Sequence, residues 1–593
     1  MILSGRARSL ALVSSLALLA AGYSWAQSVV PASDAVRVVT GGATAVAIPV
    51  LAAGAPVAVL PAAAAVMPAG ATFDFGTQTH FHQGWSASTM GLVGQVGARL
   101  LRDTVPWGSS EKAPGVYDFS GAANATLLGH CATGGRLILT IVPSHPLYDG
   151  SRSVHSDAGR AAYANYVAAL LRRFGACVSA IEVGNEVNGE GVLNYPAGLA
   201  RGATYTALLQ KLYATVKPAF PGVSILGGST NAVGTGFMEE LFKAGALAHV
   251  DGLAVHPYRS SGDGLALEIE RLNTVMARYG APKPIWATEF SYDKTDQRQV
   301  AAGMVQSVVE LYAAGVTRAS WYSLIDQQWF PNMGMFKGTA IKPAGQAYRM
   351  LADRVLPFGK PVRVDTGTLP ITAYRIGTDR WIAWGATATL TFNRQVLVRD
   401  VVGNSVAAGT RVTLGAEPVL IEGATAFTIT DAPVLADTLL QWGKAPWSYV
   451  RRGNGVDTAL GWFDNDFTSY FGDRWSKPLR INNSSAAPAG TGAAPMRAIV
   501  RYTAPVAQSV ELNACLNKSA ATGDGVDYRV EHNGRLLSSG VLVSANAIRA
   551  LRLQLAAGDR VDLVVGPNQT YGGDSFNYRV TLNRPGFAAP ACP

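Results

Sequence analysis

The sequence predicts a multidomain α/β plus β protein: a (β/α)8 TIM barrel, then a β-sandwich domain, then a C-terminal β-sandwich or jelly-roll module. Over residues 71–355, short apolar runs alternate with longer amphipathic runs, as in βα units around a parallel sheet. After about Pro357 the helical periodicity stops, and short alternating runs appear between Gly, Asn and Asp residues. A chain of 593 residues also exceeds what one hydrophobic core supports, so several domains are expected.

The first 26 residues have the pattern of a signal peptide. Arg6 and Arg8 precede an apolar run over residues 10–21, and Ser24-Trp25-Ala26 offers a cleavage site before Gln27. The apolar run is short for a bilayer core of ~30 Å, so no stable membrane insertion is expected after cleavage. The mature protein is therefore expected to be secreted or periplasmic.

Residues 27–70 form a low-complexity segment rich in Ala, Pro and Val. Prolines at positions 49, 56, 61 and 68 argue against a membrane-spanning helix. The composition is compatible with a flexible spacer and with an extended strand packed on the protein, and both interpretations stay open.

Charge and cysteine content exclude some classes of function. The formal net charge of +9 is spread along the chain without blocks of Lys or Arg, so nucleic-acid binding is not expected. Of the four cysteines, Cys131 and Cys177 lie in one predicted domain and Cys515 and Cys592 in another. Two disulfides within domains are expected in an exported protein, with free buried thiols as the alternative. The Cys/His spacing predicts no zinc site, and we expect neither a metal nor a cofactor.

Each element of the barrel can be assigned to a run of residues. Eight short apolar runs predict the strands, which are Thr72–Phe75, Ala98–Arg102, Arg136–Val142, Ala180–Gly184, Val223–Gly227, Val250–Val255, Pro284–Thr288 and Arg318–Ser323. Apolar residues at three- and four-residue spacing predict helices at Gly159–Phe174, Thr204–Val216, Leu265–Tyr279, Arg298–Ala313 and Pro343–Leu351. The alternative is a doubly wound open sheet, but no Gly-rich phosphate loop follows the first strand.

Polar residues end several of these strands, where a barrel carries its chemistry. The strands that end in this way supply Arg102, Asn185, Glu186, His256 and Glu289, with Tyr258 two residues beyond His256. Hydrolysis of a glycosidic bond needs one group to protonate the leaving oxygen and another to stabilise or capture the oxocarbenium-like carbon. Glu186 and Glu289, on the fourth and seventh strands, can point across the same mouth of a closed barrel. Their carboxyl groups are expected ~5 Å apart in a retaining enzyme and ~6.5–9.5 Å apart in an inverting one.

Other polar and aromatic residues are candidates for substrate binding. Asn185 is expected to hydrogen-bond a sugar 2-hydroxyl, and His256 or Tyr258 to orient Glu289. Trp321 is the candidate platform beneath the reacting sugar, because the apolar face of a pyranose stacks on an aromatic ring. The remaining candidates, each with a structural role as the alternative, are His80, Arg102, Trp107 and Trp329. Glu182, within the fourth strand, is interpreted as a structural partner of Arg102.

The motifs of the fourth and seventh strands resemble those of clan A glycoside hydrolases, most of all family 39 and related bacterial exopolysaccharide glycosidases. Members of that group typically read Glu-Val-Trp-Asn-Glu-Pro-Asn where this chain has Glu182-Val183-Gly184-Asn185-Glu186-Val187-Asn188, and Thr-Glu-Phe where it has Thr288-Glu289-Phe290. The resemblance implies that Glu186 is the acid/base and Glu289 the nucleophile of a retaining mechanism. Gly184 and Val187 depart from the pattern, which puts the substrate in doubt and leaves the catalytic residues in place.

The C-terminal half is predicted to be all β. Residues 356–431 form a β-rich accessory domain, with alternating runs at Ile371–Tyr374, Trp381–Trp384, Thr389–Phe392 and Val396–Val402. Residues 432–593 form a β-sandwich and a candidate carbohydrate-binding module, with runs at Ala498–Tyr502, Val526–His532, Asp559–Val565 and Asn577–Leu582. An aromatic-rich stretch near its start can bind sugars or fill a core; its members are Trp442, Trp447, Trp462, Phe463, Tyr470, Phe471 and Trp475.

Taken together, these features predict a retaining glycoside hydrolase that cleaves a polysaccharide or oligosaccharide, with an endo-acting enzyme on bacterial exopolysaccharide favoured. An exo-acting β-xylosidase-like enzyme, a transglycosylating enzyme and a non-catalytic polysaccharide-binding protein are the alternatives. The sugar is expected to be selected by loops over residues 144–154, 188–197, 259–264 and 326–337, which carry no pattern that identifies it.

Overall fold

The computed structural model describes residues 57–58, 73–472, 479–520 and 522–588. The predicted signal peptide and most of the low-complexity segment lie outside the described residues. The described chain forms two compact units. The first contains residues 57–445 and 461–471, and the second contains residues 446–460 and the chain from 472 onward.

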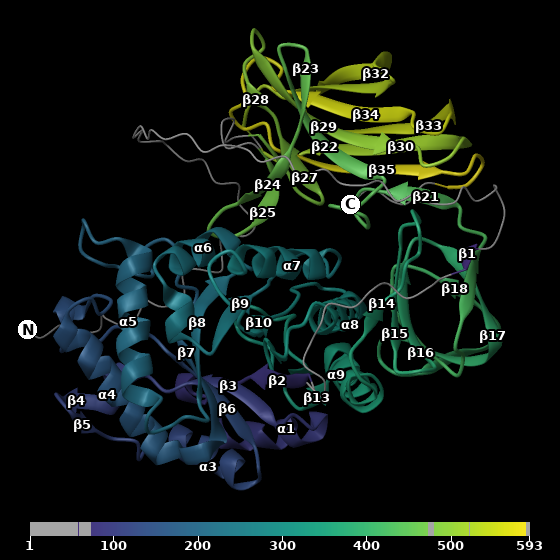
Figure 1. Ribbon diagram of the computed structural model, residues 1–593. Helices are drawn as coiled ribbons and strands as arrows, with labels where there is room; N and C mark the ends of the chain where they lie inside the picture. Colours follow the sequence, from purple (N-terminus) through teal and green to yellow (C-terminus); the bar gives the residue numbers. More distant parts are fainter. Residues whose placement is uncertain (1–56, 59–72, 473–478, 521, 589–593) are drawn as a thin grey trace, which may run out of the picture. The chain divides into compact units, whose positions relative to one another are not determined.

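The first unit is built on a closed barrel of eight parallel strands (Figure 1), which confirms the predicted (β/α)8 fold. In pairing order the strands are β2 (Asp74–Gln78), β3 (Leu100–Thr104), β6 (Arg136–Ile141), β7 (Val178–Val183), β8 (Ser224–Asn231), β9 (Gly252–His256), β10 (Ile285–Phe290) and β11 (Arg318–Trp321). β11 pairs with β2 and so closes the ring. Each strand overlaps the run of residues that predicted it.

Helices connect the strands. They are α1 (Met90–Val96), α3 (Ala122–Ala132), α4 (Asp157–Phe174), α5 (Arg201–Val216), α6 (Thr235–Lys243), α7 (Leu265–Met276), α8 (Gln297–Ala313) and α9 (Pro343–Arg354). In α4, the Ser156 hydroxyl accepts a hydrogen bond from the Gly159 backbone N–H and caps the helix, and an apolar stripe is buried. Among the described helices, none combines the length and the apolar character needed to cross a membrane.

Short elements fill several of the loops. They are α2 (Trp107–Ser110), β4 (Glu111–Ala113), β5 (Val116–Tyr117), β12 (Phe336–Lys337) and β13 (Ala340–Ile341). β4 pairs with β5 and β12 with β13 to give two small antiparallel ribbons.

Side chains inside the barrel form layers, and their order follows from the two-residue period of a strand. One buried apolar cluster takes a residue from each of six strands, namely Leu100, Ile138, Ala180, Leu226, Ala254 and Trp286. Two residues further along, toward the carboxyl ends, five of these strands carry Arg102, Thr140, Glu182, His256 and Thr288. An apolar plug therefore closes one end of the barrel interior, and a polar layer lies directly above it.

A second antiparallel sheet belongs to the same unit. It contains β14 (Val362–Arg363), β15 (Ile371–Ile376), β16 (Arg380–Gly385), β17 (Ala388–Arg399), β18 (Ser405–Leu414), β19 (Val419–Glu422) and β20 (Phe427–Thr430). Its edge strand β1 (Val57–Ala58) pairs with β20, so this part of the low-complexity segment is an extended strand. Tyr374 and Trp384 of the sheet donate hydrogen bonds to Glu310 and Asp263 on the barrel side, and Figure 1 shows the sheet beside α8 and α9.

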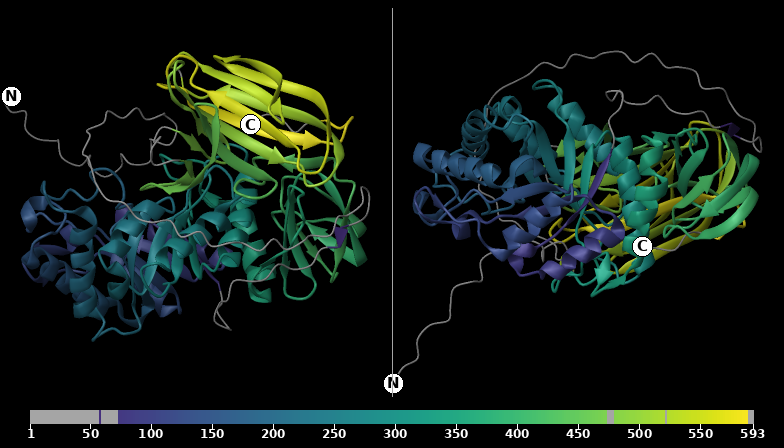
Figure 2. Two further views of the ribbon diagram at one scale, coloured as in Figure 1. Left: turned by 45° about the horizontal axis from the view of Figure 1, so that its top comes forward. Right: turned by 90° about the horizontal axis from the view of Figure 1, so that it is seen from below.

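The second unit consists of two antiparallel sheets (Figure 2). One contains β22 (Trp447–Gly453), β23 (Val456–Ala459), β28 (Ala489–Gly490), β29 (Pro495–Thr503), β31 (Val526–His532), β32 (Arg535–Leu542) and β34 (Arg560–Gly566). The other contains β26 (Arg480–Ile481), β27 (Ser485–Ala487), β30 (Gln508–Lys518), β33 (Ala545–Leu555) and β35 (Phe576–Asn583). Val500 and Leu563 of the first sheet line the same small apolar cavity as Leu512 and Val580 of the second. The two sheets therefore pack face to face as a sandwich.

The hairpin β24 (Gly461–Asp464) and β25 (Ser469–Gly472) interrupts the sequence of the second unit. Residues 461–471 belong to the barrel unit, although the chain on either side of them belongs to the sandwich. Within the barrel unit, the rings of Trp462 and Phe471 contact Trp442, with centroids 5.1 and 5.7 Å away. Trp462 and Phe471 of the aromatic-rich stretch therefore pack against the barrel unit and hold the hairpin in place.

The cysteines pair as expected where they are described. Cys131, in α3, and Cys177, just before β7, form a disulfide with a Cα–Cα distance of 5.5 Å. Cys515 is also disulfide-bonded, and Cys592 lies outside the described residues.

Candidate active site

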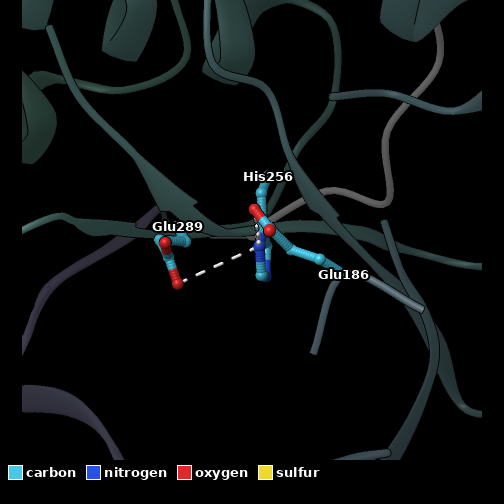
Figure 3. A group of neighbouring side chains, drawn as sticks. All are labelled: Glu186, His256 and Glu289. Atoms are coloured by element: carbon cyan, nitrogen blue, oxygen red, sulfur yellow. Dashed lines mark ion pairs between the residues drawn. The ribbon is translucent and has the colours of Figure 1, made fainter. Parts of the chain in front are cut away.

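Glu186 and Glu289 lie side by side at the carboxyl ends of the barrel strands. An oxygen of each carboxyl group and a ring nitrogen of His256 all lie within 4.8 Å of one another. Figure 3 shows His256 between the two glutamates. Its Nδ1 is 3.6 Å from Glu186 and 3.9 Å from Glu289. Only 3% of Glu186 and 5% of Glu289 is exposed, so both carboxyl groups are largely removed from water.

The backbone after β7 is bent sharply to present Glu186. Gly184 has a φ of +85° and Glu186 a φ of +49°, a region that costs a residue with a side chain about 1–3 kcal/mol. The bend is held by hydrogen bonds from the Val187 N–H to the Ser229 carbonyl and from the Gly189 N–H to the Glu186 carbonyl. The side chain of Val187 lies where a Cβ on Gly184 would be, at 2.4 Å. The two departures from the family pattern are therefore coupled, because one makes space for the other.

Two strong donors fix Glu289. An Arg102 Nη1–H donates to one carboxylate oxygen at 2.6 Å, and the Tyr258 hydroxyl donates to the other at 2.6 Å. With both oxygens engaged, the carboxylate has one orientation, and these contacts suit its ionised form. Of the two residues expected to orient Glu289, Tyr258 makes the direct hydrogen bond.

The polar layer beneath the two glutamates is a closed ion network. Arg102 Nε–H donates to Glu182 at 2.6 Å, and His256 Nε2 lies 3.0 Å from the other Glu182 oxygen. The pKa of Glu182 is held below its usual value because the Arg102 charge and the His256 hydrogen bond outweigh the opposing effect of burial. The interpretation of Glu182 as a structural partner of Arg102 is confirmed.

His256 is the cation of this network that can lose its proton. Burial alone lowers its pKa, but the charge of Glu289 and the contacts with Glu182 and Glu186 outweigh burial and raise the pKa to about 9. The imidazole is therefore protonated at neutral pH. Among the described residues, its Nδ1 has no hydrogen-bond partner, and it lies next to both glutamates.

Asn231, Asn188 and Tyr322 were not among the predicted site residues. The Asn231 side-chain amide donates to a Glu186 oxygen at 3.0 Å, and Asn188 holds Asn231 through two further hydrogen bonds. The largely buried ring of Tyr322 lies edge-on to His80 and to Tyr258, and the pKa of its hydroxyl is raised by burial and then by the charge of Glu289. Asn231 ends β8, Tyr322 directly follows β11, and Asn188 ends the motif after the fourth strand, so their places at strand ends are the signal that could have found them.

The other predicted residues have varied positions. Asn185 is half-buried and accepts a hydrogen bond from Arg102 at 2.9 Å. His80 is buried against Trp85 and Tyr322, and burial, with the charge of Arg102, lowers its pKa to about 3. Arg102 itself is buried and forms ion pairs with Glu182 and Glu289, so it fixes the orientation of both carboxyl groups. Trp329 is 65% exposed on the loop after β11.

The prediction that Trp321 is a platform for the sugar is wrong, and Trp107 has the structural role that was its alternative. Trp321 has no exposed surface, donates its indole N–H to the Met333 carbonyl and packs edge-on against Phe290. Trp107 is 2% exposed and lies in a cluster of tyrosine rings. Neither ring has a free face for a sugar, because each fills a core layer instead.

The group formed by Glu186, His256 and Glu289 has the residue types of a metal site. Its electrostatics argue against a cation. Arg102 already supplies a positive charge 2.6 Å from Glu289, and a cation would have to displace the proton that the raised pKa of His256 favours. The arrangement suits two carboxyl groups in different roles better than a metal centre.

Comparisons with known proteins find a family model and solved structures that are similar to this chain. Residues 203–348 match the family model of the glycosyl hydrolase catalytic core. A family 39 glycoside hydrolase from the gut symbiont Bacteroides cellulosilyticus WH2 is similar in structure, with a TM-score of 0.51 at 18% identity over 59% of this chain and 80% of that chain. A β-xylosidase from Caulobacter crescentus has a TM-score of 0.43 at 15% identity over 62% and 98% of the two chains. A family 86 β-porphyranase from Bacteroides plebeius has a TM-score of 0.41 at 11% identity over 89% and 97%. No curated protein sequence matches the chain.

The matched residues include the part of the barrel that carries His256 and Glu289, and the likeness to the Bacteroides cellulosilyticus structure shows the fold. Residues 203–348 of the barrel are thus similar to a glycosyl hydrolase catalytic core.

Proposed function

We propose that this protein is a retaining glycosidase that cleaves O-glycosidic bonds in a polysaccharide or oligosaccharide. The observation that carries the proposal is the placement of Glu186 and Glu289, with carboxylate oxygens within 4.8 Å. Retaining enzymes have carboxyl groups ~5 Å apart, whereas inverting enzymes need ~6.5–9.5 Å to admit a water molecule between them.

In the first step, Glu289 attacks the anomeric carbon. Its two hydrogen bonds, from Arg102 and Tyr258, hold the carboxylate in place and cost no rearrangement during attack. Glu186 gives its proton to the leaving oxygen, so that the bond from carbon to oxygen breaks as the bond to Glu289 forms. The products are a free sugar and a glycosyl ester on Glu289.

In the second step, Glu186 changes role. Now ionised, it accepts a proton from a water molecule that attacks the anomeric carbon, and Glu289 leaves as a carboxylate. The His256 imidazolium lies next to both carboxyl groups and so moderates the negative charge that moves between them. Two displacements at one carbon retain the anomeric configuration.

For the substrate, we propose an endo-acting enzyme on bacterial exopolysaccharide, on the strength of the motif resemblance at Glu182–Asn188 and Thr288–Phe290. Product lengths from a polymer distinguish this from an exo-acting β-xylosidase-like enzyme, since an exo enzyme releases monosaccharides from the start. Assays at high acceptor concentration distinguish hydrolysis from transglycosylation. We also propose that the protein is secreted or periplasmic, which the Cys131–Cys177 disulfide supports because disulfides persist in oxidising compartments.

The test is hydrolysis of a glycan panel, bacterial exopolysaccharides included, by the wild type and three variants. Glu289→Ala and Glu186→Gln remove the two proposed catalytic groups, and Glu270→Gln is the matched control, an exposed glutamate on the barrel helix α7. We expect cleavage by the wild type and the control, a loss of about 10⁴-fold or more in Glu289→Ala, and a loss of about 10²-fold or more in Glu186→Gln. Cleavage that survives in Glu289→Ala contradicts the mechanism, and no cleavage by the wild type favours a binding protein.

A further inference from the structure

The loop of the β24–β25 hairpin, Asp464 to Thr468, is docked on the barrel next to the segment that follows β8. Figure 1 shows β24 and β25 next to α6 and α7. The Gly234 N–H donates to the Phe467 carbonyl at 3.1 Å, and the Gly236 N–H donates to the Asn465 carbonyl at 2.9 Å. Both glycines lie just after β8, the strand that ends with Asn231. The loop is thus bonded backbone to backbone to the segment that leads out of the active site.

Ion pairs fix the same loop to two barrel helices. Arg201, at the start of α5, lies 2.8 Å from Asp466, and Arg271 of α7 lies 2.6 Å from Asp464. Inside the loop, the Asn465 side chain accepts hydrogen bonds from the backbone N–H groups of Phe467 and Thr468. The loop therefore has a defined conformation as well as a defined place.

A short chain of hydrogen bonds joins this loop to Glu186. The Asn188 amide donates to the Asp466 carbonyl at 2.6 Å and to the Asn231 carbonyl at 2.9 Å. The Asn188 side-chain oxygen accepts from the Asn231 N–H at 2.8 Å, and the Asn231 amide donates to Glu186 at 3.0 Å. Asn188 is almost fully buried, so its orientation depends on these partners.

Phe467 is the exposed aromatic residue of the loop. The residue is 40% exposed. Its backbone is fixed by two hydrogen bonds, because its carbonyl accepts from the Gly234 N–H and its N–H donates to the Asn465 side chain. A general acid lies on the side of the bond from which the leaving sugar departs. An exposed aromatic ring whose backbone is fixed suits the apolar face of a pyranose, and the hydrogen bonds of its loop lead to the proposed general acid.

We propose that the loop over residues 464–468 is a working part of the active site. In this proposal, the ring of Phe467 stacks on the leaving-group sugar. Asn188 is a positioning residue, because it hydrogen-bonds both the loop and Asn231, and Asn231 hydrogen-bonds Glu186. A shift of the loop therefore shifts Glu186. The chain segment that sequence reasoning assigned to a separate binding module thus completes the barrel site. The proposal rests on the proposed glycosidase function and adds a determinant of specificity to it.

Gly236 offers a precise way to disturb the loop alone. A Cβ at this position would meet the Asn465 carbonyl oxygen at 2.6 Å, so Gly236→Ala must displace the docked loop. Alanine is otherwise favourable at a helical position. The matched control is Gly129→Ala in α3, where a Cβ would meet nothing within 4 Å. Thermal unfolding of each variant checks that the barrel remains folded.

The experiment compares two kinds of substrate on the full-length protein. One is whichever hexasaccharide of β-1,3-glucan, β-1,4-xylan, β-1,4-mannan or a bacterial exopolysaccharide the wild type cleaves fastest. The other is the glycosyl fluoride of the same sugar, which has no leaving sugar and needs no proton from Glu186. For Phe467→Ala we expect kcat/KM on the hexasaccharide to fall about tenfold more than on the fluoride, chiefly through KM. For Asn188→Ala and Gly236→Ala we also expect a fall in the ratio of kcat/KM on the hexasaccharide to kcat/KM on the fluoride. This fall is expected chiefly through a lower kcat on the hexasaccharide.

The outcomes separate the two proposals. Ratios that fall in the three loop-site variants and stay at the wild-type value in Gly129→Ala support the role of the loop. Cleavage by the wild type with no change of ratio in any variant overturns the loop proposal and leaves the glycosidase in place. A wild type that cleaves neither the hexasaccharides nor the fluorides overturns the proposed function, and the loop proposal with it.

Discussion

At the scale of single residues, the site depends on how buried charges compensate one another. Glu182 and Glu289 face Arg102 and the protonated His256, and this network is buried. A buried charge is tolerated only when it is paired, so each member holds the others in their charge states. Loss of the proton from His256 is therefore expected to destabilise the folded protein.

Stability is predicted to fall as the pH rises toward about 9. The pKa of His256 is raised from 6.5 to about 9 in the folded state, so its contribution is fully present below pH 6.5 and is lost as the pH rises through about 9. Urea unfolding at pH 6, 7.5 and 9 measures this as a decrease of a few kcal/mol. In His256→Asn the free energy of unfolding should be lower at pH 6 and should vary less with pH. Equal pH dependence in both proteins would contradict the assignment.

A second residue-scale prediction concerns the bend before Glu186. Gly184→Ala introduces a Cβ 2.4 Å from Val187 at a φ of +85°, and both effects are unfavourable. We expect a loss of about 1–3 kcal/mol of stability and reduced kcat, because the position of Glu186 shifts. In Gly184→Ala/Val187→Ala the clash is removed and the backbone cost remains, so activity should recover in part. Full activity in the single variant would show that the bend is not constrained in this way.

At the scale of elements, the alternation of side chains along a strand explains which features the sequence could and could not predict. The strand positions could be predicted because apolar runs and amphipathic runs differ in period. Whether Trp321 or its neighbour Tyr322 faces the site could not be predicted, because adjacent residues at a strand end face opposite sides and a shift of one residue exchanges them. Asn231 was not predicted as a site residue, because β8 extends four residues beyond its predicted end. The extension follows an irregularity between Gly227 and Thr230 that breaks the alternation of side chains between the two faces of the strand.

The disulfide gives a prediction for the βα framework. Cys131 and Cys177 are separated by 46 residues, and the bond restricts that loop in the unfolded chain. Cys131→Ser/Cys177→Ser should therefore lose about 2–4 kcal/mol, measured by urea unfolding of the two oxidised proteins. The same double variant in reducing buffer should match the reduced wild type. A variant as stable as the oxidised wild type would mean that the bond does not constrain the fold.

At the scale of the whole molecule, the sequence could predict three types of domain but not which residues pack with each of them. Composition marks residues 461–471 as part of the sandwich segment, yet they pack with the barrel through contacts to residues 188, 201, 234, 236 and 271. Contacts across more than 190 residues leave no periodic signal in the sequence. The closeness of Glu186 and Glu289 could be predicted, because both motifs are local and both end strands of the barrel.

The contact between the barrel and the adjoining sheet can also be tested. The Tyr374 hydroxyl donates to Glu310 at 2.7 Å, and Glu310 is almost fully buried. Tyr374→Phe leaves a buried carboxylate oxygen without its donor, so we expect a loss of about 1–3 kcal/mol. Tyr279→Phe removes an exposed hydrogen bond to Glu239 and is the control, with an expected change below about 0.5 kcal/mol. Equal losses in the two variants, measured by urea unfolding, would contradict a buried contact at Tyr374.

The central claim is that Glu289 forms a covalent bond with the sugar. The most direct measurement is to incubate the wild type with 2-deoxy-2-fluoroglycosides of the sugar it cleaves and to locate the label by mass spectrometry of the digested protein. The account predicts one added glycosyl group on the peptide that contains Glu289, none in Glu289→Ala, and product of retained configuration by NMR. A label on another residue, or product of inverted configuration without any label, would contradict the account.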